Sequence, residues 1–146
     1  MEERKVALIG SGNFAWHLMQ LFTKVNAQPI LHYARNEEAF AGFPSVSGAK
    51  RSTHWEDLFT ADVCFLAVSD RSISPLSSKL LGKDQLIIHV SGGKSIDAIK
   101  GERRAVFYLP QTLTKGRLID LSDVFACIEA DRADDLHWLN ELAIQM

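Results

Sequence analysis

Residues 10–15 read Gly-Ser-Gly-Asn-Phe-Ala, which places three small residues at the spacing G-x-G-x-x-A between an apolar segment and an amphipathic one. In such a loop Gly10 permits a tight turn, Gly12 lets the backbone approach a pyrophosphate, and Ala15 allows close packing of helix on strand. Free N–H groups at the start of the following helix attract phosphate oxygens. The spacing therefore predicts a dinucleotide site, with a structural turn or a site for another nucleotide-like ligand as the alternatives.

The residues after the second apolar segment bear on which dinucleotide binds. An NAD site usually has Asp or Glu about 20 residues after the glycine loop, where it bonds the ribose 2′-hydroxyl. Residues 31–36 instead read Leu-His-Tyr-Ala-Arg-Asn. Arg35 could hold a 2′-phosphate, helped by Asn36 and by Lys50 or Arg51, and the alternative is a solvated surface charge. We therefore expect NADP rather than NAD, and the missing carboxylate argues against a methyltransferase.

Polar residues also follow the next two apolar segments. Ligands of open parallel sheets lie at the carboxyl ends of the strands, so we expect Val68 and Ser69 beside the dinucleotide. His89 and Ser91 are the candidates for catalysis, the first as a proton donor and the second as a hydrogen-bonding partner of the carboxamide or a substrate. The alternatives are a hydrogen-bonded core histidine at position 89 and, for Asp70, a helix N-cap.

Short apolar segments that alternate with longer amphipathic ones must position these residues. The strand candidates are residues 6–9, 30–33, 63–68, 86–90, 105–109 and 124–128, and the helix candidates are residues 13–24, 55–59, 73–80, 95–99 and 131–146. Several strand candidates are apolar at nearly every position, as strands covered on both faces are. We therefore expect an α/β fold, a doubly wound and mostly parallel sheet with helices on both faces.

The composition bounds the partners and the compartment. The chain has 146 residues, of which 47% are hydrophobic, and this predicts one domain with an apolar core. The 16 basic residues are balanced by 18 acidic ones, so there is no excess of positive charge of the kind that binds nucleic acid. The longest apolar run, residues 63–68, is too short to cross a membrane. Both cysteines, Cys64 and Cys127, lie in apolar segments, where we expect them buried. We expect a cytoplasmic protein with a small-molecule partner, no metal site, and neither nucleic acid nor membrane as a partner.

The segments IGSGNFAWHL, HYARN, AVSDRSI, IIHVSGG, FYLPQTLTKG and CIEA follow one another along the whole chain. Their order resembles a Rossmann-like NADP oxidoreductase family whose members carry a C-terminal domain of unknown function. That family is related to pyrroline-5-carboxylate reductase, deazaflavin-dependent NADP reductase and 6-phosphogluconate dehydrogenase. The resemblance implies cofactor contacts at Gly10, Ser11, Gly12, Asn13, Phe14, Ala15, Arg35, Val68 and Ser69, with His89, Ser91 and Gly92 near the nicotinamide. Family members commonly have His where this chain has Tyr108.

The resemblance implies hydride transfer to or from nicotinamide on a small molecule. A non-catalytic NAD(P)-binding sensor or regulatory domain is the alternative. We expect residues 1–130 to form the NADP-binding domain. Residues 131–146 are amphipathic to the last residue, so we expect them to begin the helix leading to a C-terminal helical domain that this sequence lacks, and the chain alone could be inactive. The alternatives are that the helix docks on the sheet, or that its apolar face makes a homodimer.

Overall fold

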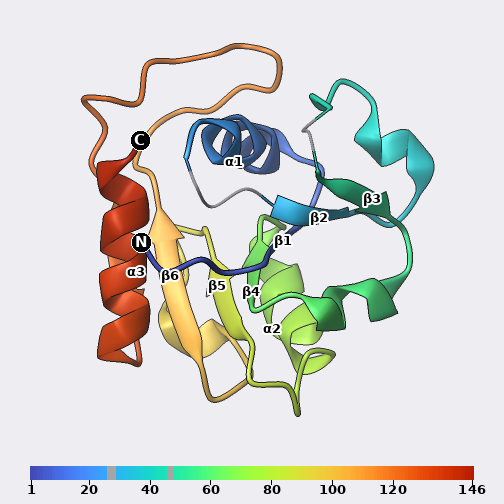
Figure 1. Ribbon diagram of the computed structural model, residues 1–146, viewed down its shortest axis with the longest axis vertical. Helices are drawn as coiled ribbons and strands as arrows, with labels where there is room; N and C mark the ends of the chain where they lie inside the picture. Colours follow the sequence, from blue (N-terminus) through green and yellow to red (C-terminus); the bar gives the residue numbers. More distant parts are fainter. Residues whose placement is uncertain (26–28, 46–47) are drawn as a thin grey trace.

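The computed structural model describes residues 1–25, 29–45 and 48–146, and in them seven strands form one sheet of order β3-β2-β1-β4-β5-β6-β7. Figure 1 labels β1 to β6 of this sheet. Neighbouring strands are parallel, except that β7 runs antiparallel to β6. The strands are β1 (Val6–Ile9), β2 (Pro29–Tyr33), β3 (Lys50–Ser52), β4 (Val63–Leu66), β5 (Leu86–His89), β6 (Arg104–Tyr108) and β7 (Cys127–Ala130). The expected doubly wound, mostly parallel fold is therefore confirmed.

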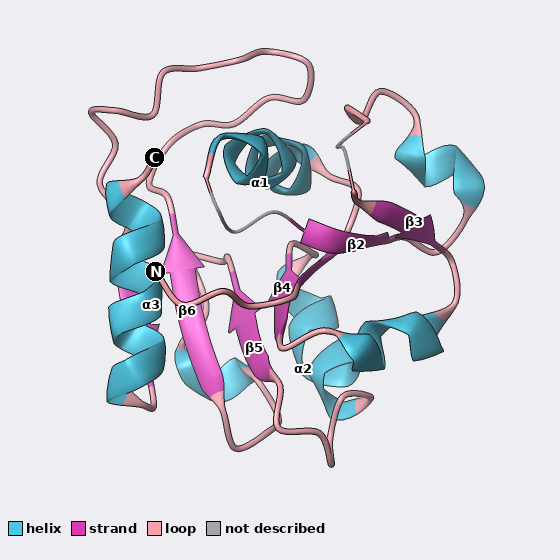
Figure 2. Ribbon diagram, in the orientation of Figure 1, coloured by secondary structure: helices cyan, strands magenta, loops and turns pink. Residues whose placement is uncertain are grey.

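Three α-helices and three short 3-10 helices cover the sheet in the described residues (Figure 2). They are α1 (Asn13–Lys24), α2 (Asp70–Ser78) and α3 (Ala133–Ile144), with η1 (Glu37–Phe40), η2 (Trp55–Thr60) and η3 (Ile96–Ala98). None of the helices within these ranges is long and apolar enough to cross a membrane.

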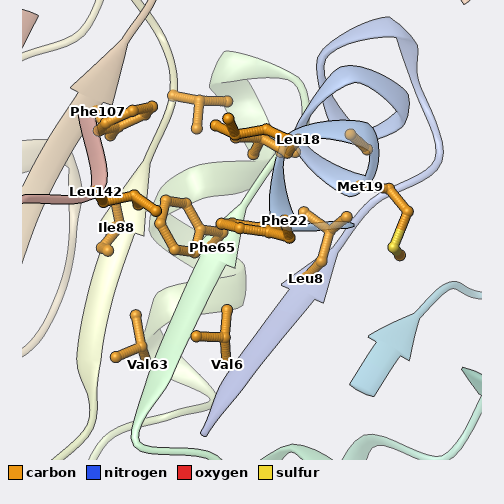
Figure 3. Close-up of a cluster of buried hydrophobic side chains, with 14 of the residues drawn as sticks. Val6, Leu8, Leu18, Met19, Phe22, Val63, Phe65, Ile88, Phe107 and Leu142 are labelled. Atoms are coloured by element: carbon orange, nitrogen blue, oxygen red, sulfur yellow. The ribbon is translucent and has the colours of Figure 1, made fainter. Parts of the chain in front are cut away.

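The side chains of each central strand alternate between two separate apolar clusters. In β1, Val6 and Leu8 join the cluster under α1 and α3, whereas Ala7 and Ile9 join the one under α2. Phe65 of β4 meets Phe22 of α1 edge-on at 5.1 Å between ring centroids (Figure 3). Because successive side chains of a strand point to opposite faces, a strand covered on both faces must be apolar throughout.

The structure departs from the sequence-based expectations mainly at the two edges of the sheet. The strand β3 was not expected, and β7 begins three residues later and ends two residues later than the candidate at 124–128. Cys127, expected to be buried, is exposed on β7. Helices cover the faces of edge strands only in part, so the sequence of an edge strand need not be apolar at every position. The helix α2 begins at Asp70 with Ser69 as its N-cap, three residues before the expected start.

The C-terminal helix α3 is docked on the sheet. Trp138, Leu139 and Leu142 are fully buried in the same apolar cluster as α1. The carboxylate of Asp131 does not cap the helix but accepts a 2.7 Å hydrogen bond from Arg104. The structure therefore agrees with the alternative in which the helix docks on the sheet, because the chain's own core covers most of its apolar face.

Candidate functional site

A cavity of about 680 Å³ opens where β1, β2, β4 and β5 end. Its lining consists of residues 9–14, 33–35, 67–72, 75–76, 79 and 90–91. The direction in which strands are added to the sheet reverses here: β2 and β3 lie on one side of β1, and the chain then crosses to place β4 on the other side. Ligands of doubly wound sheets bind at this switch point.

The two glycines of the first loop have different reasons to be glycine. Gly10 has a φ of 129°, and a Cβ atom there would collide with the carbonyl oxygen of Ala67. Gly12 has an ordinary φ of −86°, and no atom within the described residues lies within 4 Å of the place of its Cβ. Position 10 therefore needs glycine for the fold of the chain, whereas glycine at position 12 leaves open space beside the backbone for a ligand in the cavity.

The start of α1 faces the same loop. Gly12 is its N-cap, with no side chain bonded to the first turn within the described part of the chain. The side chain of Asn13 turns away, because its Oδ1 accepts a 3.0 Å hydrogen bond from the N–H of Lys115. Ala15 is fully buried and does not line the cavity, which agrees with a role in packing α1 against β1. The backbone N–H groups of the first turn are thus left for an anion.

Three basic side chains line the cavity on the side of β2 and α2, namely Arg35, Arg71 and Lys79. Arg35 follows β2, is exposed, and has no salt bridge to any other residue that the structure describes. The ammonium of Lys79 lies 5.3 Å from the ring centroid of Trp55. Arg71 of α2 and Lys79, the C-cap of that helix, flank Pro75 at helical spacing, so both face the cavity.

The expected helpers of Arg35 have other partners. Lys50 pairs with Asp57 at 3.0 Å, and Arg51 donates to the carbonyl oxygen of Phe43 at 3.0 Å. The side chain of Asn36 accepts the N–H of Ala39 and so begins η1. None of Lys50, Arg51 and Asn36 lines the cavity. The packing of β3 and η1 thus gives these three side chains other partners and does not bring them to the cavity with Arg35.

At the β5 side of the cavity, Ser91 is the polar residue that lines it. Its hydroxyl accepts a 3.1 Å hydrogen bond from the N–H of Gly93. Gly92 does not line the cavity, because it is pressed against Tyr108, where a Cβ would lie 2.5 Å from the ring. Asp70 lies beside Gly93, with its Oδ2 3.4 Å from the place of that glycine's Cβ.

His89 is fully buried and does not line the cavity. Its Nδ1 accepts a 3.2 Å hydrogen bond from the N–H of Ser91, so Nε2 carries the proton and donates to the carbonyl oxygen of Ser95 at 3.0 Å. Both ring nitrogens are thus engaged, as in the alternative of a hydrogen-bonded core histidine.

Sequence reasoning missed Tyr33, Arg71 and Lys79 in the lining. The spacing of residues 71, 75 and 79 puts them on one face of a helix, and this was the signal available for two of them. The spacing alone does not predict that this face of the helix turns toward the glycine loop. No group of three His, Cys, Asp or Glu that could hold a metal occurs in the residues described.

Comparison with known proteins gives one family match. The family model described as NADP oxidoreductase, coenzyme F420-dependent, matches residues 5–93. The sequence has no match among curated proteins.

Similar solved structures share the fold over nearly the whole chain. A structure from Bacteroides fragilis described as that of an NADP oxidoreductase is 24% identical, with a TM-score of 0.83 over 98% of this chain and 57% of that one. Prephenate dehydrogenase from A. aeolicus, in complex with hydroxyphenyl propionate and NAD⁺, is 15% identical, with a TM-score of 0.75 over 99% and 58%. For 1-pyrroline-5-carboxylate reductase from Streptococcus pyogenes the identity is 13% and the TM-score 0.69, over 97% and 53%. The chain spans little more than half the length of each.

Proposed function

The chain belongs to the family of coenzyme F420-dependent NADP oxidoreductases, and we propose that its cavity binds NADP in preference to NAD. The family resemblance seen in the motifs is thereby confirmed, and the chain is an NAD(P)-dependent Rossmann domain of that family. The preference for NADP rests on one observation, the three basic side chains that line the cavity beside β2 and α2.

The charges around the cavity are divided between its two sides. Arg35, Arg71 and Lys79 are the basic residues of the lining, and Asp70 is the acidic one. Asp70 lies beside Gly93, on the β5 side. No carboxylate of the lining therefore follows β2, where it would bond a 2′-hydroxyl and repel a 2′-phosphate. A guanidinium at that place forms strong charge-assisted hydrogen bonds with phosphate.

The remaining lining residues fit the rest of a dinucleotide. We expect residues 10–14 to bind the pyrophosphate, because Gly12 leaves room for it and the first turn of α1 offers free N–H groups. Val68 and Ser69 would then lie along the middle of the ligand, and Ser91 would approach the nicotinamide. Ala15, Asn36 and Gly92 would act only through packing or loop shape, because they do not line the cavity.

We propose that the protein is an oxidoreductase for a small molecule, with residues 1–130 as its nucleotide-binding domain. When bound, NADPH supplies a hydride from C4 of its nicotinamide. The chain's own residues hold the ligand and orient that end toward Ser91. No observation in the described residues favours the non-catalytic sensor.

The test is calorimetric titration of the chain with NADPH and with NADH. We expect tighter binding of NADPH, weakened about tenfold by Arg35→Ala through the loss of a charged hydrogen bond, with NADH unaffected. Arg71→Ala and Lys79→Ala should each weaken NADPH less. Lys100→Ala, an exposed lysine away from the lining, is the matched control. Equal affinity for the two nucleotides, or unchanged NADPH binding in Arg35→Ala, would overturn the preference.

A further inference from the structure

The peptide unit that follows Gly10 is held from β2 by a buried histidine. The register of β1 and β2 sets Ile9 opposite Tyr33, and the N–H of Gly10 donates to the carbonyl oxygen of Tyr33 at 3.1 Å. The carbonyl oxygen of Gly10 in turn lies 2.8 Å from Nε2 of His32. Gly10 is thus bonded to β2 through both of its backbone polar groups.

The protonation of His32 follows from these partners. A carbonyl oxygen only accepts, so Nε2 must carry the proton and donate it. The other ring nitrogen, Nδ1, is buried and has no partner among the described residues. Burial lowers the pKa of His32, and the nearby charges of Arg51 and Lys115 lower it further against the opposing effect of the bond to Gly10. The ring is therefore neutral at physiological pH, with one defined tautomer.

The ring of His32 is also fixed in space. It packs against Phe40 and Phe43, with ring centroids 5.0 and 4.6 Å away. A side chain needed only for packing would be apolar here, because the unpartnered Nδ1 is costly to bury. The bond from Nε2 to Gly10 is the contact that an apolar ring could not make.

We propose that His32 is a positioning residue, which holds the Gly10 carbonyl so that the next N–H, that of Ser11, is presented to the pyrophosphate. In a planar trans peptide the C=O and the N–H point in opposite directions. The described residues contain no cis peptide bond, so a carbonyl held toward His32 turns the N–H of Ser11 away from it. Ser11 lines the cavity. The inference rests on the proposed function, since the pyrophosphate belongs to the dinucleotide.

The experiment compares His32→Gln, His32→Leu and the unaltered chain. The amide nitrogen of Gln can stand where Nε2 stands, whereas Leu keeps only bulk. We expect NADPH affinity to fall about tenfold in His32→Leu, as for a lost hydrogen bond to a charged group, and to be largely restored in His32→Gln. Phe107→Leu, a buried position on β6 away from the loop, is the control for general loss of stability.

A second measurement does not depend on the variants folding. Nitrogen NMR of the unaltered chain should show His32 as the Nε2–H tautomer, and the Ser11 amide signal should move when NADPH binds. An Nδ1–H tautomer, an unmoved Ser11 signal, or equal affinity losses in His32→Leu and Phe107→Leu would overturn the inference. If the unaltered chain bound neither NADPH nor NADH, the proposed function would fall, whereas NADPH affinity unchanged in His32→Leu would remove only the role of His32.

Discussion

Gly10 leaves no room for a Cβ atom beside the carbonyl oxygen of Ala67, at the point where β1 and β4 both end. The N–H of Ala67 donates to the carbonyl oxygen of Ile9 at 2.9 Å, so the two strands stay paired up to this contact. The loops that follow β1 and β4 are therefore brought together without any side chain between them. Because the ends of the two strands lie in contact, both loops line one cavity.

Replacement of Gly10 should damage the fold, whereas replacement of Gly12 should not. Gly10→Ala adds a Cβ that collides with Ala67 at a φ of 129°, which we expect to cost about 3 kcal/mol of unfolding free energy. Gly12→Ala meets open space at an ordinary φ, so its stability should stay near that of the unaltered chain while NADPH binding weakens. Urea unfolding and calorimetry measure the two effects, and equal stability of the two variants would contradict the reasoning.

The ionic network around Asp135 should be a main support of the C-terminal helix. Asp135 of α3 is fully buried and bonds Arg103 at 2.7 and 2.6 Å and Arg4 at 2.6 Å. Asp135→Asn removes the buried counter-charge of both guanidinium groups, which keep only the more exposed Glu2 and Asp84 as acidic partners. We expect a loss of about 3 kcal/mol. The control is Asp131→Asn, which breaks the more exposed pair with Arg104 and should cost less than about 1 kcal/mol. Similar unfolding midpoints for both variants would argue against this role.

The stability of the protein should fall as the pH is lowered through the histidine range. His32 has a folded-state pKa below its ordinary value of 6.5, chiefly through burial. Below pH 6.5 the His32 side chain takes up a proton in the unfolded chain, whereas the folded chain resists this protonation. The contribution of His32 to the free energy of unfolding is therefore complete above pH 6.5 and is lost as the pH falls toward the folded-state pKa. We expect His32→Gln to show a smaller drop in urea midpoint between about pH 8 and about pH 5 than the unaltered chain does. An unchanged drop would show that other groups cause it.

A further acid transition belongs to Asp135. Burial alone would raise the pKa of this carboxyl, but the bonds from Arg103 and Arg4 outweigh burial and hold its pKa below the ordinary 3.8. Its contribution is present above that value and is lost as the pH falls through the folded pKa. In Asp135→Asn the loss of stability below this pH should therefore be shallower, as acid unfolding followed by circular dichroism would record.

The two cysteines should differ sharply in reactivity. Burial raises the pKa of the Cys64 thiol to about 12, whereas Cys127 is exposed on β7. A thiol reagent should modify one cysteine per folded chain and both after unfolding in denaturant, because the thiolate is the reactive form. Cys127→Ser should abolish the native-state reaction. Rapid labelling of Cys64 in the folded chain would contradict the packing of β4.

Local patterns predicted the segment that carries the glycine loop. The bounds of β1 and α1 agree with residues 6–9 and 13–24, because a strand covered on both faces, a loop and an amphipathic helix follow one another without interruption. Residues 10–14 line the cavity, as their spacing suggested. Only Ala15 is turned into the core, where its small size matters for packing.

The edges of the sheet and the ends of helices were predicted less well. The strand β3 is short and polar, so no apolar run announces it. In β7 alternate residues are exposed, and the apolar residues before it belong to a loop that packs on the core. Asp131, the first residue of the helix candidate at 131–146, lies before α3 and is engaged by Arg104, a residue of the neighbouring β6. The spacing of residues along the chain does not show whether a side chain will bond its own helix or a distant partner.

The sequence alone determined the fold class, the glycine loop and its place between β1 and α1, because each depends on neighbouring residues and on the period of their side chains. Only the tertiary structure decided which distant residues join that loop. It brought Arg71 of α2 and Lys79 at the end of that helix to the cavity. It also enclosed the ring of His89 between Ser91 and Ser95, and covered α3 with the sheet. The physical reason is that periodicity tells which face of an element is apolar, whereas the packing of the whole chain selects what lies against that face.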